Sequence, residues 1–500
     1  MEKSRLPQEF RRIPHDFCCM SANQTAQYAF TGLQPLADHD QERWQSGRMR
    51  IIANDVTPEM GSEGSNPSLS VPARIPDAGL FFAPYACLAE LPPAMSGSPF
   101  QQRLTGSLQA LADAHRLRSR SIAQRTDAVH CLTGGRRLIS FASNDYLGLS
   151  FHPLVLRAFQ QTAQLQAGAG ASPLIIGRSL QQQQLEEHLA AWEETESVTV
   201  FPSGFAANTG TLTALAGPRD VIFCDRENHA SLIDGCRSSA AKFLVYDRSR
   251  LDRLHAALQN RRREYELAFI VTDTVYSMDG TTADLPALCQ LAADHDAVVL
   301  ADEAHASGVF GDRGCGVCEQ QQQLVPVRVG TLSKAFGCHG GFTAGSRELG
   351  EWLWNAGRSQ FFSTALPPAV LAAATAALEV IIREPERRRV LQDRSALLRR
   401  MLREFEVPVI THPAESASAA AGRLSPEGSP IVAVTVGDSA RAVAVSNRLQ
   451  AAGYVIPAIR PPTVPAGTAR LRLSVCSEHT EEHIQRAAEA VRNALHAEPI

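Results

Sequence analysis

Two segments of the sequence place residues capable of covalent chemistry directly after apolar runs. The run Ala297–Leu300 leads into Asp302, and His305 comes three residues later. The run Val325–Val329 leads into Lys334, which stands 32 positions after Asp302. A lysine can form an imine with a carbonyl group, and an aspartate can hold a protonated ring nitrogen. Taken singly, Asp302 also suits a helix N-cap and Lys334 a solvated turn, so the prediction depends on the pair.

Pyridoxal phosphate is the cofactor that needs such a pair. The lysine carries the cofactor, while the aspartate keeps its pyridine nitrogen protonated so that the ring can accept electrons from a carbanion. A lysine among apolar groups and near a cationic ring has a lowered pKa, which favours imine formation and later proton transfer. A phosphate site is also predicted, because Ser203, Gly204 and Phe205 follow the run Val198–Phe201 and open an expected helix. Backbone N–H groups at a helix N-terminus bind anions.

Six short apolar runs position these residues, and helical stretches separate the runs. They are Val198–Phe201, Val221–Cys224, Phe243–Tyr246, Phe269–Thr272, Ala297–Leu300 and Val325–Val329. Continuous β-branched runs predict strands that are buried on both faces of a mainly parallel sheet. Ligands of open α/β sheets bind at the carboxyl ends of the strands, where His229, Asp302 and Lys334 stand. The predicted fold class is therefore α/β.

The predicted domain organisation has four parts. Residues 1–94 are broken by prolines throughout and lack helical or strand periodicity, so we expect no packed domain there. Residues 95–145 are expected to form an N-terminal helix and strand segment, in which the amphipathic stretch Phe100–Arg120 is the helix. Residues 146–366 are expected to form the large cofactor-binding domain. Residues 367–500 are expected to form a smaller α+β domain with strands at Ile431–Val436 and Leu471–Val475.

The first segment permits a second interpretation. Gly64-Ser65-Asn66-Pro67 can be encoded by a nucleotide string typical of the T arm of a transfer RNA gene, and Trp44–Arg48 resembles such a gene read as protein. We therefore expect translation to start at Met95, with a genuine unstructured leader as the alternative. The hypothesis fails if codons 44–70 cannot fold as a cloverleaf.

Composition excludes several classes of protein. The 48 Lys+Arg and 52 Asp+Glu residues give a net charge of −4, which offers no electrostatic case for nucleic acid or an anionic membrane. No apolar run approaches the roughly 18 residues that a membrane-spanning helix needs. Eleven cysteines in 500 residues are too sparse for a disulfide scaffold, and the one CxxC, Cys315–Cys318, lacks a second pair at zinc-site spacing. We expect no metal and a cytoplasmic location.

From about Phe100 to its C-terminus the chain resembles the α-oxoamine synthases, which are pyridoxal phosphate enzymes of fold type I. The resemblance lies in ordered segments: Ser143–Leu149, Ser203–Asn208, His229–Leu232, Ser277–Gly280, Asp302–His305, Thr331–Lys334 and Ala458–Leu473. The last segment is the most discriminating. It is similar to the members that condense L-alanine with a pimeloyl thioester, carried by coenzyme A or acyl carrier protein, in biotin biosynthesis. The resemblance also implies a homodimer with its active site at the subunit interface.

The resemblance implies a role for each matched residue. Lys334 would carry the cofactor and transfer protons, Asp302 would hold the pyridinium nitrogen, and His229 would stack on the ring near the substrate. Further cofactor contacts are implied for Gly204, Phe205, Ser277, His305 and Thr331. Ser363 and Thr364 would complete the phosphate site of the neighbouring subunit. Substrate contacts are implied for Arg118, Asn144, Arg460 and Thr463.

The chain departs from the family pattern in the Gly-rich stretch Gly168–Arg178, where Pro173 removes a backbone donor. This puts loop contacts to the substrate in doubt but leaves the reaction class unchanged. One alternative is another α-oxoamine synthase that uses a different acyl thioester or amino acid, such as an enzyme resembling glycine C-acetyltransferase. A transcription regulator with an aminotransferase-like domain is the other. Against it, residues 1–94 show no helix pair at helix-turn-helix spacing and no basic recognition helix.

Overall fold

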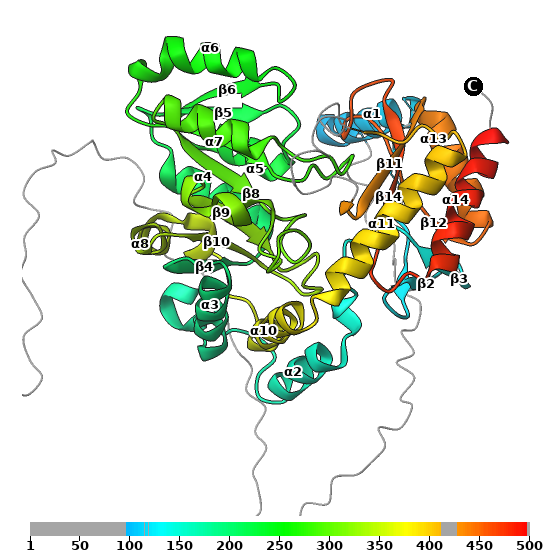
Figure 1. The fold of residues 1–500 in the computed structure, drawn as a ribbon, viewed down its shortest axis with the longest axis horizontal. Coiled ribbons are helices and arrows are strands. Elements are labelled where there is room, and N and C mark those ends of the chain that lie inside the picture. Colours follow the sequence, from blue (N-terminus) through cyan, green and yellow to red (C-terminus); the bar gives the residue numbers. More distant parts are fainter. Residues whose placement is uncertain (1–96, 115, 119, 412–427, 498–500) are drawn as a thin grey trace, which may run out of the picture. The chain divides into compact units, whose positions relative to one another are not determined.

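A seven-stranded sheet forms the centre of the part of the chain that the computed structural model describes, residues 97–114, 116–118, 120–411 and 428–497. The strand order is β4-β10-β9-β8-β7-β5-β6 (Figure 1). The strands are β4 (Ser197–Phe201), β5 (Val221–Asp225), β6 (Lys242–Tyr246), β7 (Ala268–Asp273), β8 (Val298–Asp302), β9 (Val327–Thr331) and β10 (Gly341–Gly345). β10 is antiparallel to both of its neighbours, and the other neighbouring strands are parallel. The predicted α/β class is confirmed, and every predicted run overlaps a strand.

The sequence did not predict β10. Its two terminal glycines, Gly341 and Gly345, weaken the strand signal because glycine has no side chain to pack against neighbouring strands. The structure gives the reason for the first of them. A Cβ atom on Gly341 would lie only 2.5 Å from the backbone nitrogen of Gly204, so glycine allows the start of α4 to approach the sheet.

Helices cover both faces of the large sheet. One face is covered by α4 (Gly204–Leu215), α5 (Ala230–Ser238) and α8 (Arg347–Ala356), and the other by α6 (Leu251–Arg261) and α7 (Leu285–Asp294). In β7, Phe269 and Val271 pack toward α4, α5 and α8, while Ala268 and Ile270 pack toward α6 and α7. Both faces of the strand are thus buried, which explains why its apolar run is continuous rather than alternating.

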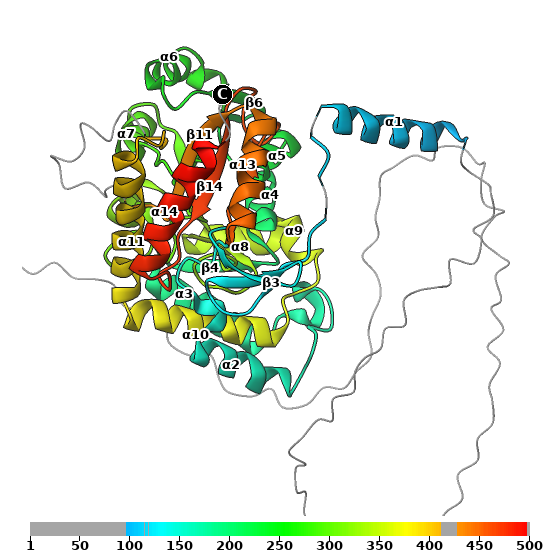
Figure 2. The same cartoon turned by 90° about the vertical axis from the view of Figure 1, so that its right-hand side faces the viewer.

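The C-terminal part builds a second, antiparallel sheet in the order β11-β14-β13. Its elements are α10 (Pro368–Arg383), α11 (Glu386–Glu404), β11 (Ile431–Gly437), α13 (Ser439–Ala451), β12 (Tyr454–Val455), β13 (Ala458–Ile459), β14 (Ala469–Ser474) and α14 (Glu481–His496). Helices α11, α13 and α14 lie against this sheet (Figure 2). The strands predicted at 431–436 and 471–475 are confirmed as β11 and β14.

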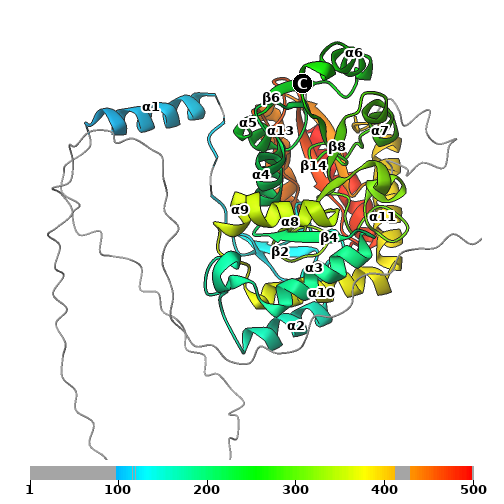
Figure 3. The same ribbon diagram turned by 90° about the vertical axis from the view of Figure 1, so that its left-hand side faces the viewer.

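A third sheet has the order β1-β2-β3-β12 and joins the segment around residues 124–140 to the C-terminal part. Its remaining strands are β1 (Gln124–Arg125), β2 (His130–Thr133) and β3 (Arg136–Ser140). Helix α10 packs against α2 (Pro153–Ala163) and α3 (Leu180–Trp192) (Figure 3). Two further short helical elements are η2 (Pro173–Gly177) and α9 (Arg358–Phe361).

Some expectations differ from the structure or lie beyond it. Helix α1 (Pro99–Asp113) starts at the Ser98 N-cap and ends before the predicted Arg120. Residues 1–94 lie outside the described residues, and the domain boundaries at 145 and 366 stay predictions. Among the described residues, no helix combines the length and the apolar character needed to cross a membrane.

Candidate active site

Two acidic side chains end adjacent strands at the carboxyl edge of the large sheet. Asp302 ends β8 and Asp273 ends β7, and the two residues are partners in the parallel register. Each side chain is buried. Asp302 accepts hydrogen bonds from Nδ2 of Asn208 at 2.6 Å and from the backbone nitrogen of Ala304 at 2.8 Å. These donors fix the orientation of the Asp302 carboxyl group at the strand end.

Lys334 lies in the turn that follows β9, beside this edge. Burial lowers the pKa of Lys334 to about 8, Asp302 and Asp273 oppose the shift, and Arg472 adds to it. The cost of holding a cation away from water thus outweighs the attraction of two neighbouring carboxyl groups. A neutral amine, which is the nucleophilic form, is therefore accessible near neutral pH.

A hydrogen-bond chain connects Asp302 to His229, the N-cap of α5. Nδ2 of Asn208 donates to Asp302 and also to Oγ of Ser231, at 2.9 Å. Oγ of Ser231 lies 2.7 Å from Nδ1 of His229, and the Ser231 amide donates to the same nitrogen. Nδ1 is therefore an acceptor, so a neutral His229 carries its proton on Nε2. Burial lowers the pKa of His229, against the opposing charge of Asp302, and this favours the neutral ring.

Asp273 holds the backbone of the same histidine. Its Oδ2 accepts from the His229 amide at 2.6 Å. Burial raises the pKa of Asp273 well above the ordinary value, and the neighbouring Asp302 adds to the rise. Two carboxyl groups this close favour one proton between them, and the raised pKa of Asp273 makes it the member that carries this proton.

His305 lies near Lys334 and contacts Tyr146. Its Nδ1 is 2.7 Å from the Tyr146 hydroxyl, which also donates to Oδ1 of Asn144 at 3.3 Å. Burial lowers the pKa of His305 well below its usual range, and the Lys334 charge acts in the same direction. Burial raises the pKa of Tyr146 to about 12. Both side chains are therefore neutral hydrogen-bonding groups near neutral pH.

The N-terminus of α4 fits a phosphate group. Oγ of Ser203 caps the helix by accepting from the Ala206 amide at 3.1 Å, and the amides of Gly204 and Phe205 precede that position. A helix N-terminus offers such amides to an anion. A Cβ atom on Gly204 would lie 3.1 Å from Oγ1 of Thr331, so the helix start and the end of β9 are in close contact. This brings the predicted phosphate ligands Gly204 and Thr331 together.

The residues expected around the substrate fall into two groups. Arg118 donates to Oγ1 of Thr463 at 3.4 Å, and the Thr463 amide donates to the carbonyl of Arg460 at 3.1 Å. Asn144 lies instead beside Tyr146 and accepts from Nη1 of Arg472 at 3.1 Å. The chain therefore presents one group at the turn after β13 and another next to His305.

Ser363 and Thr364 are not brought to the cluster around Lys334 by any hydrogen bond among the described residues. They lie between α9 and α10, where the Ala365 amide donates to the carbonyl of Ala171 at 3.0 Å. Pro173, the departure noted in the Gly-rich stretch, is the first residue of η2. An amide is not needed for the helical ladder at that position, so Pro173 is accommodated without loss of a hydrogen bond.

Arg472, which is only 6 % exposed, is a site residue that was not predicted from the sequence. Its Nε donates to the carbonyl of Ser277 at 2.6 Å, and Nη1 donates to Asn144 and to Oγ of Ser474. Its positive charge lowers the pKa of both Lys334 and His305. The alternation Arg470-Leu471-Arg472-Leu473 is typical of a strand with one polar face, so the sequence alone does not distinguish this buried arginine from a solvated one. A buried arginine next to the lysine is the natural anchor for a carboxylate.

Comparison with known proteins shows the family of the chain. Residues 136–491 match the family model Aminotransferase class I and II. An 8-amino-7-oxononanoate synthase from Aromatoleum aromaticum is 41 % identical over 402 residues, which cover 79 % of this chain and 99 % of the relative. The chain belongs to the class I and II aminotransferases, in the 8-amino-7-oxononanoate synthase family. The prediction that the chain is an enzyme of this kind is confirmed.

Solved structures show the fold of the family. A serine palmitoyltransferase from S. paucimobilis with bound PLP and myriocin has a TM-score of 0.73 and 28 % identity, covering 80 % of this chain and 99 % of that one. An 8-amino-7-oxononanoate synthase from Francisella tularensis has a TM-score of 0.60 and 26 % identity, covering 73 % of this chain and 99 % of that one. The predicted fold type I is confirmed.

Proposed function

We propose that this member of the 8-amino-7-oxononanoate synthase family condenses L-alanine with a pimeloyl thioester in biotin biosynthesis. The products are 8-amino-7-oxononanoate, carbon dioxide and the free thiol carrier. The observation that carries the reaction class is the placement of Lys334, after β9, beside the paired carboxyl groups of Asp302 and Asp273, where burial lowers the pKa of the lysine. The choice of alanine and of a pimeloyl donor is supported by the names of the relatives.

We propose pyridoxal phosphate as the cofactor, held by residues whose arrangement fits it. Lys334 would hold its carbonyl carbon and Asp302 its pyridine nitrogen. His229 would cover one face of the ring, and the start of α4 with Thr331 would bind its phosphate. When bound, the cofactor supplies an electron sink for the electrons of a broken Cα bond. The PLP in the related serine palmitoyltransferase supports this choice.

The chain's own residues supply binding and proton transfer. Lys334 would act as the base, because its neutral amine can remove the Cα proton and later return one. Nε2–H of His229 points away from the Ser231 bond and can donate to the oxygen of the acyl group. Arg472 and Asn144 bind the amino-acid carboxylate, and Arg118, Arg460 and Thr463 are proposed contacts of the acyl donor. Ser277 and His305 are proposed contacts of the cofactor's phenolic oxygen.

We propose that the active unit is a homodimer. Three large apolar residues in η2 and just after α9 are exposed: Ile175 by 79 %, Ile176 by 74 % and Phe362 by 67 %. The two neighbourhoods are joined by the bond from Ser172 Oγ to the carbonyl of Phe361. Such a patch on the surface of one chain marks an interface. Ser363 and Thr364 follow it directly and would reach the phosphate site of the partner.

The carrier and the compartment are finer points of the proposal. Either coenzyme A or acyl carrier protein can present the pimeloyl group. The cysteines among the described residues are free thiols. This agrees with the proposed reducing, cytoplasmic location.

A purified-protein assay tests the proposal. The loaded enzyme is offered L-alanine, glycine or L-serine against acetyl, succinyl, pimeloyl and palmitoyl thioesters, and thiol release is measured. We expect turnover with L-alanine and the pimeloyl donor to exceed every other pair. Preference for glycine with an acetyl donor would instead favour the alternative of a glycine C-acetyltransferase-like enzyme.

A further inference from the structure

A tight turn, Tyr276–Thr281, lies between the large sheet and the C-terminal sheet. Two backbone bonds close it, from the Tyr276 amide to the carbonyl of Thr281 and from the Gly280 amide to the carbonyl of Tyr276, each 2.9 Å long. Gly280 has a φ of +75°, and a Cβ atom there would lie 2.2 Å from the carbonyl oxygen of Ile431 in β11. The turn therefore packs directly on the C-terminal sheet.

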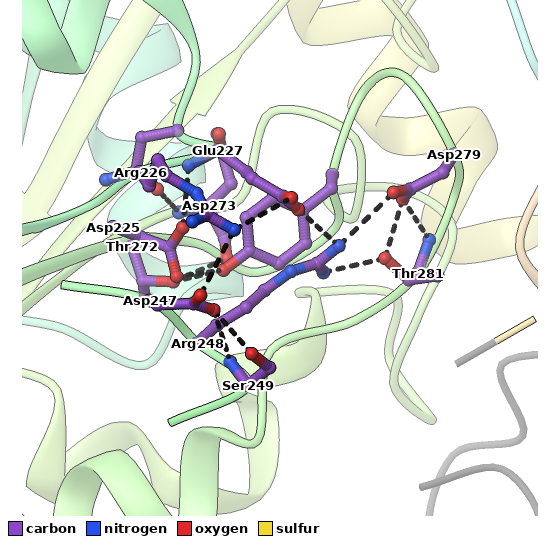
Figure 4. A network of polar contacts seen from close by, with 12 residues as sticks. Asp225, Arg226, Glu227, Asp247, Arg248, Ser249, Thr272, Asp273, Asp279 and Thr281 are labelled. Atoms are coloured by element: carbon purple, nitrogen blue, oxygen red, sulfur yellow. Dashed lines mark hydrogen bonds and ion pairs between the residues drawn. The ribbon is translucent and has the colours of Figure 1, made fainter. Parts of the chain in front are cut away.

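Arg248, two residues after β6, holds this turn from the side of the large sheet (Figure 4). Its guanidinium carbon lies 3.6 Å from the centre of the Tyr276 ring. Nη1 donates to Oγ1 of Thr281 at 2.7 Å, and Nη2 pairs with Oδ2 of Asp279 at 3.2 Å and with Glu227 at 2.7 Å. The side chain of Arg248 is 13 % exposed, so these contacts are little screened by water.

The Tyr276 ring is itself fixed from behind. Its hydroxyl donates to Oδ2 of Asp225 at 3.1 Å and lies 3.1 Å from Oγ1 of Thr272. Asp225 and Thr272 belong to β5 and β7, so the ring is bound to the sheet edge that carries the active site. Arg248 thus holds the turn against the ends of β5 and β7.

The opposite side of the turn contacts β14 of the C-terminal sheet. Nε of Arg472 donates to the carbonyl of Ser277 at 2.6 Å, and Arg470 lies 3.9 Å from the Asp279 carboxylate. A guanidinium group is planar, so the position of the acceptor at Nε sets the direction of the other two nitrogens. The carbonyl of Ser277 is therefore one of the three acceptors, with Asn144 and Ser474, that set the direction in which Arg472 points.

We infer that Arg248 is a positioning residue: through the turn Tyr276–Thr281 it holds Arg472 in the orientation that binds the substrate carboxylate. Arg248 lies on the large-sheet side of the turn and Arg472 on the other, so the coupling passes through Asp279, Thr281 and the Ser277 carbonyl. The inference rests on the proposed function for its substrate, an amino acid, and goes beyond it in assigning a residue outside the site. Without Arg248 the turn loses its only cationic contact to the large sheet among the bonds described above.

The test compares three variants of the loaded enzyme: Arg248→Met, Arg248→Lys and the control Arg250→Met. Arg250 is a neighbouring exposed arginine paired with Asp252, so its loss removes a charge of the same sign without touching the turn. For Arg248→Met we expect the KM for L-alanine to rise about tenfold with kcat changed less than about threefold. Arg248→Lys keeps the charge but not the planar stack or the fork, so it should lie between.

A double variant and an exchange measurement make the result specific. In an Arg472→Lys background, Arg248→Met should add little to the KM, because both changes act on one interaction. Amide hydrogen exchange in residues 276–282 should be faster in Arg248→Met than in Arg250→Met. An unchanged KM, with only a lower melting temperature, would overturn the inference, as would unchanged exchange in the turn.

These readouts separate the inference from the proposed function. If the wild-type enzyme does not turn over L-alanine with a pimeloyl thioester, the proposed function is wrong. The role of Arg248 is then decided by the exchange measurement and by titration of the loaded enzyme with L-alanine, glycine and L-serine. Equal affinity of wild type and Arg248→Met for each amino acid would overturn it.

Discussion

At the scale of single residues, the charge state of Lys334 controls capture of the cofactor. Its pKa is lowered to about 8 from an ordinary 10.5, so the neutral amine becomes the major form once the pH exceeds about 8. The rate at which cofactor-free enzyme takes up pyridoxal phosphate should therefore rise with pH and level off above that value. Stopped-flow absorbance between pH 6.5 and 10 measures it, and a rate that still rises steeply at pH 10 would contradict the lowered pKa.

Asn208 connects Asp302 with the Ser231–His229 pair, so its loss should disorder both. Hydrogen bonds to charged groups contribute about 1.5–3 kcal/mol, which predicts a fall in kcat of roughly 10- to 100-fold for Asn208→Leu. The exposed Asn355, whose amide donates to the carbonyl of Glu351, supplies the control variant Asn355→Leu. Steady-state kinetics measure kcat for both variants. A wild-type kcat in Asn208→Leu would show that the hydrogen bonds of Asn208 to Asp302 and Ser231 are not needed for turnover.

The residues that the sequence revealed are those at the ends of apolar strands. Asp302, His229 and Lys334 each follow a continuous apolar run. Such runs can be recognised in the sequence without knowledge of the fold. Arg472 and Asp273 were not predicted from the sequence. Arg472 enters the site only because β14 pairs with β11 and meets the turn after β7, which is a long-range contact. Asp273 belongs to the site because the parallel register places it beside Asp302. The sequence of a single strand does not determine this register.

At the scale of elements, the antiparallel strand β10 supports the phosphate-binding end of α4. Gly341→Ala would place a Cβ atom 2.5 Å from the Gly204 nitrogen, so the start of α4 must shift. We expect the dissociation constant for pyridoxal phosphate to rise about tenfold, because anion-binding amides depend on their direction. Gly217→Ala, where the nearest atom is 3.5 Å away, is the matched control. Equilibrium dialysis measures both, and equal affinity in the two variants would refute the expectation.

At the scale of the whole molecule, the exposed apolar patch of Ile175, Ile176 and Phe362 should hold two chains together. A charge introduced at a buried interface costs several kcal/mol, so Ile175→Asp with Ile176→Asp should give monomers at micromolar concentration. Light scattering after size exclusion reports the mass. The variant should also lose activity, because Ser363 and Thr364 then lack a partner site. A fully active monomer would contradict the shared active site.

The assignment of this chain to decarboxylative condensation is tested most directly by following the carboxyl carbon of alanine. L-alanine labelled at C1 is incubated with the loaded enzyme, with and without pimeloyl thioester. We predict that labelled carbon dioxide appears only with the thioester and in equal amount to 8-amino-7-oxononanoate and free thiol. Retention of the label in the product, or carbon dioxide release independent of the thioester, would contradict the account.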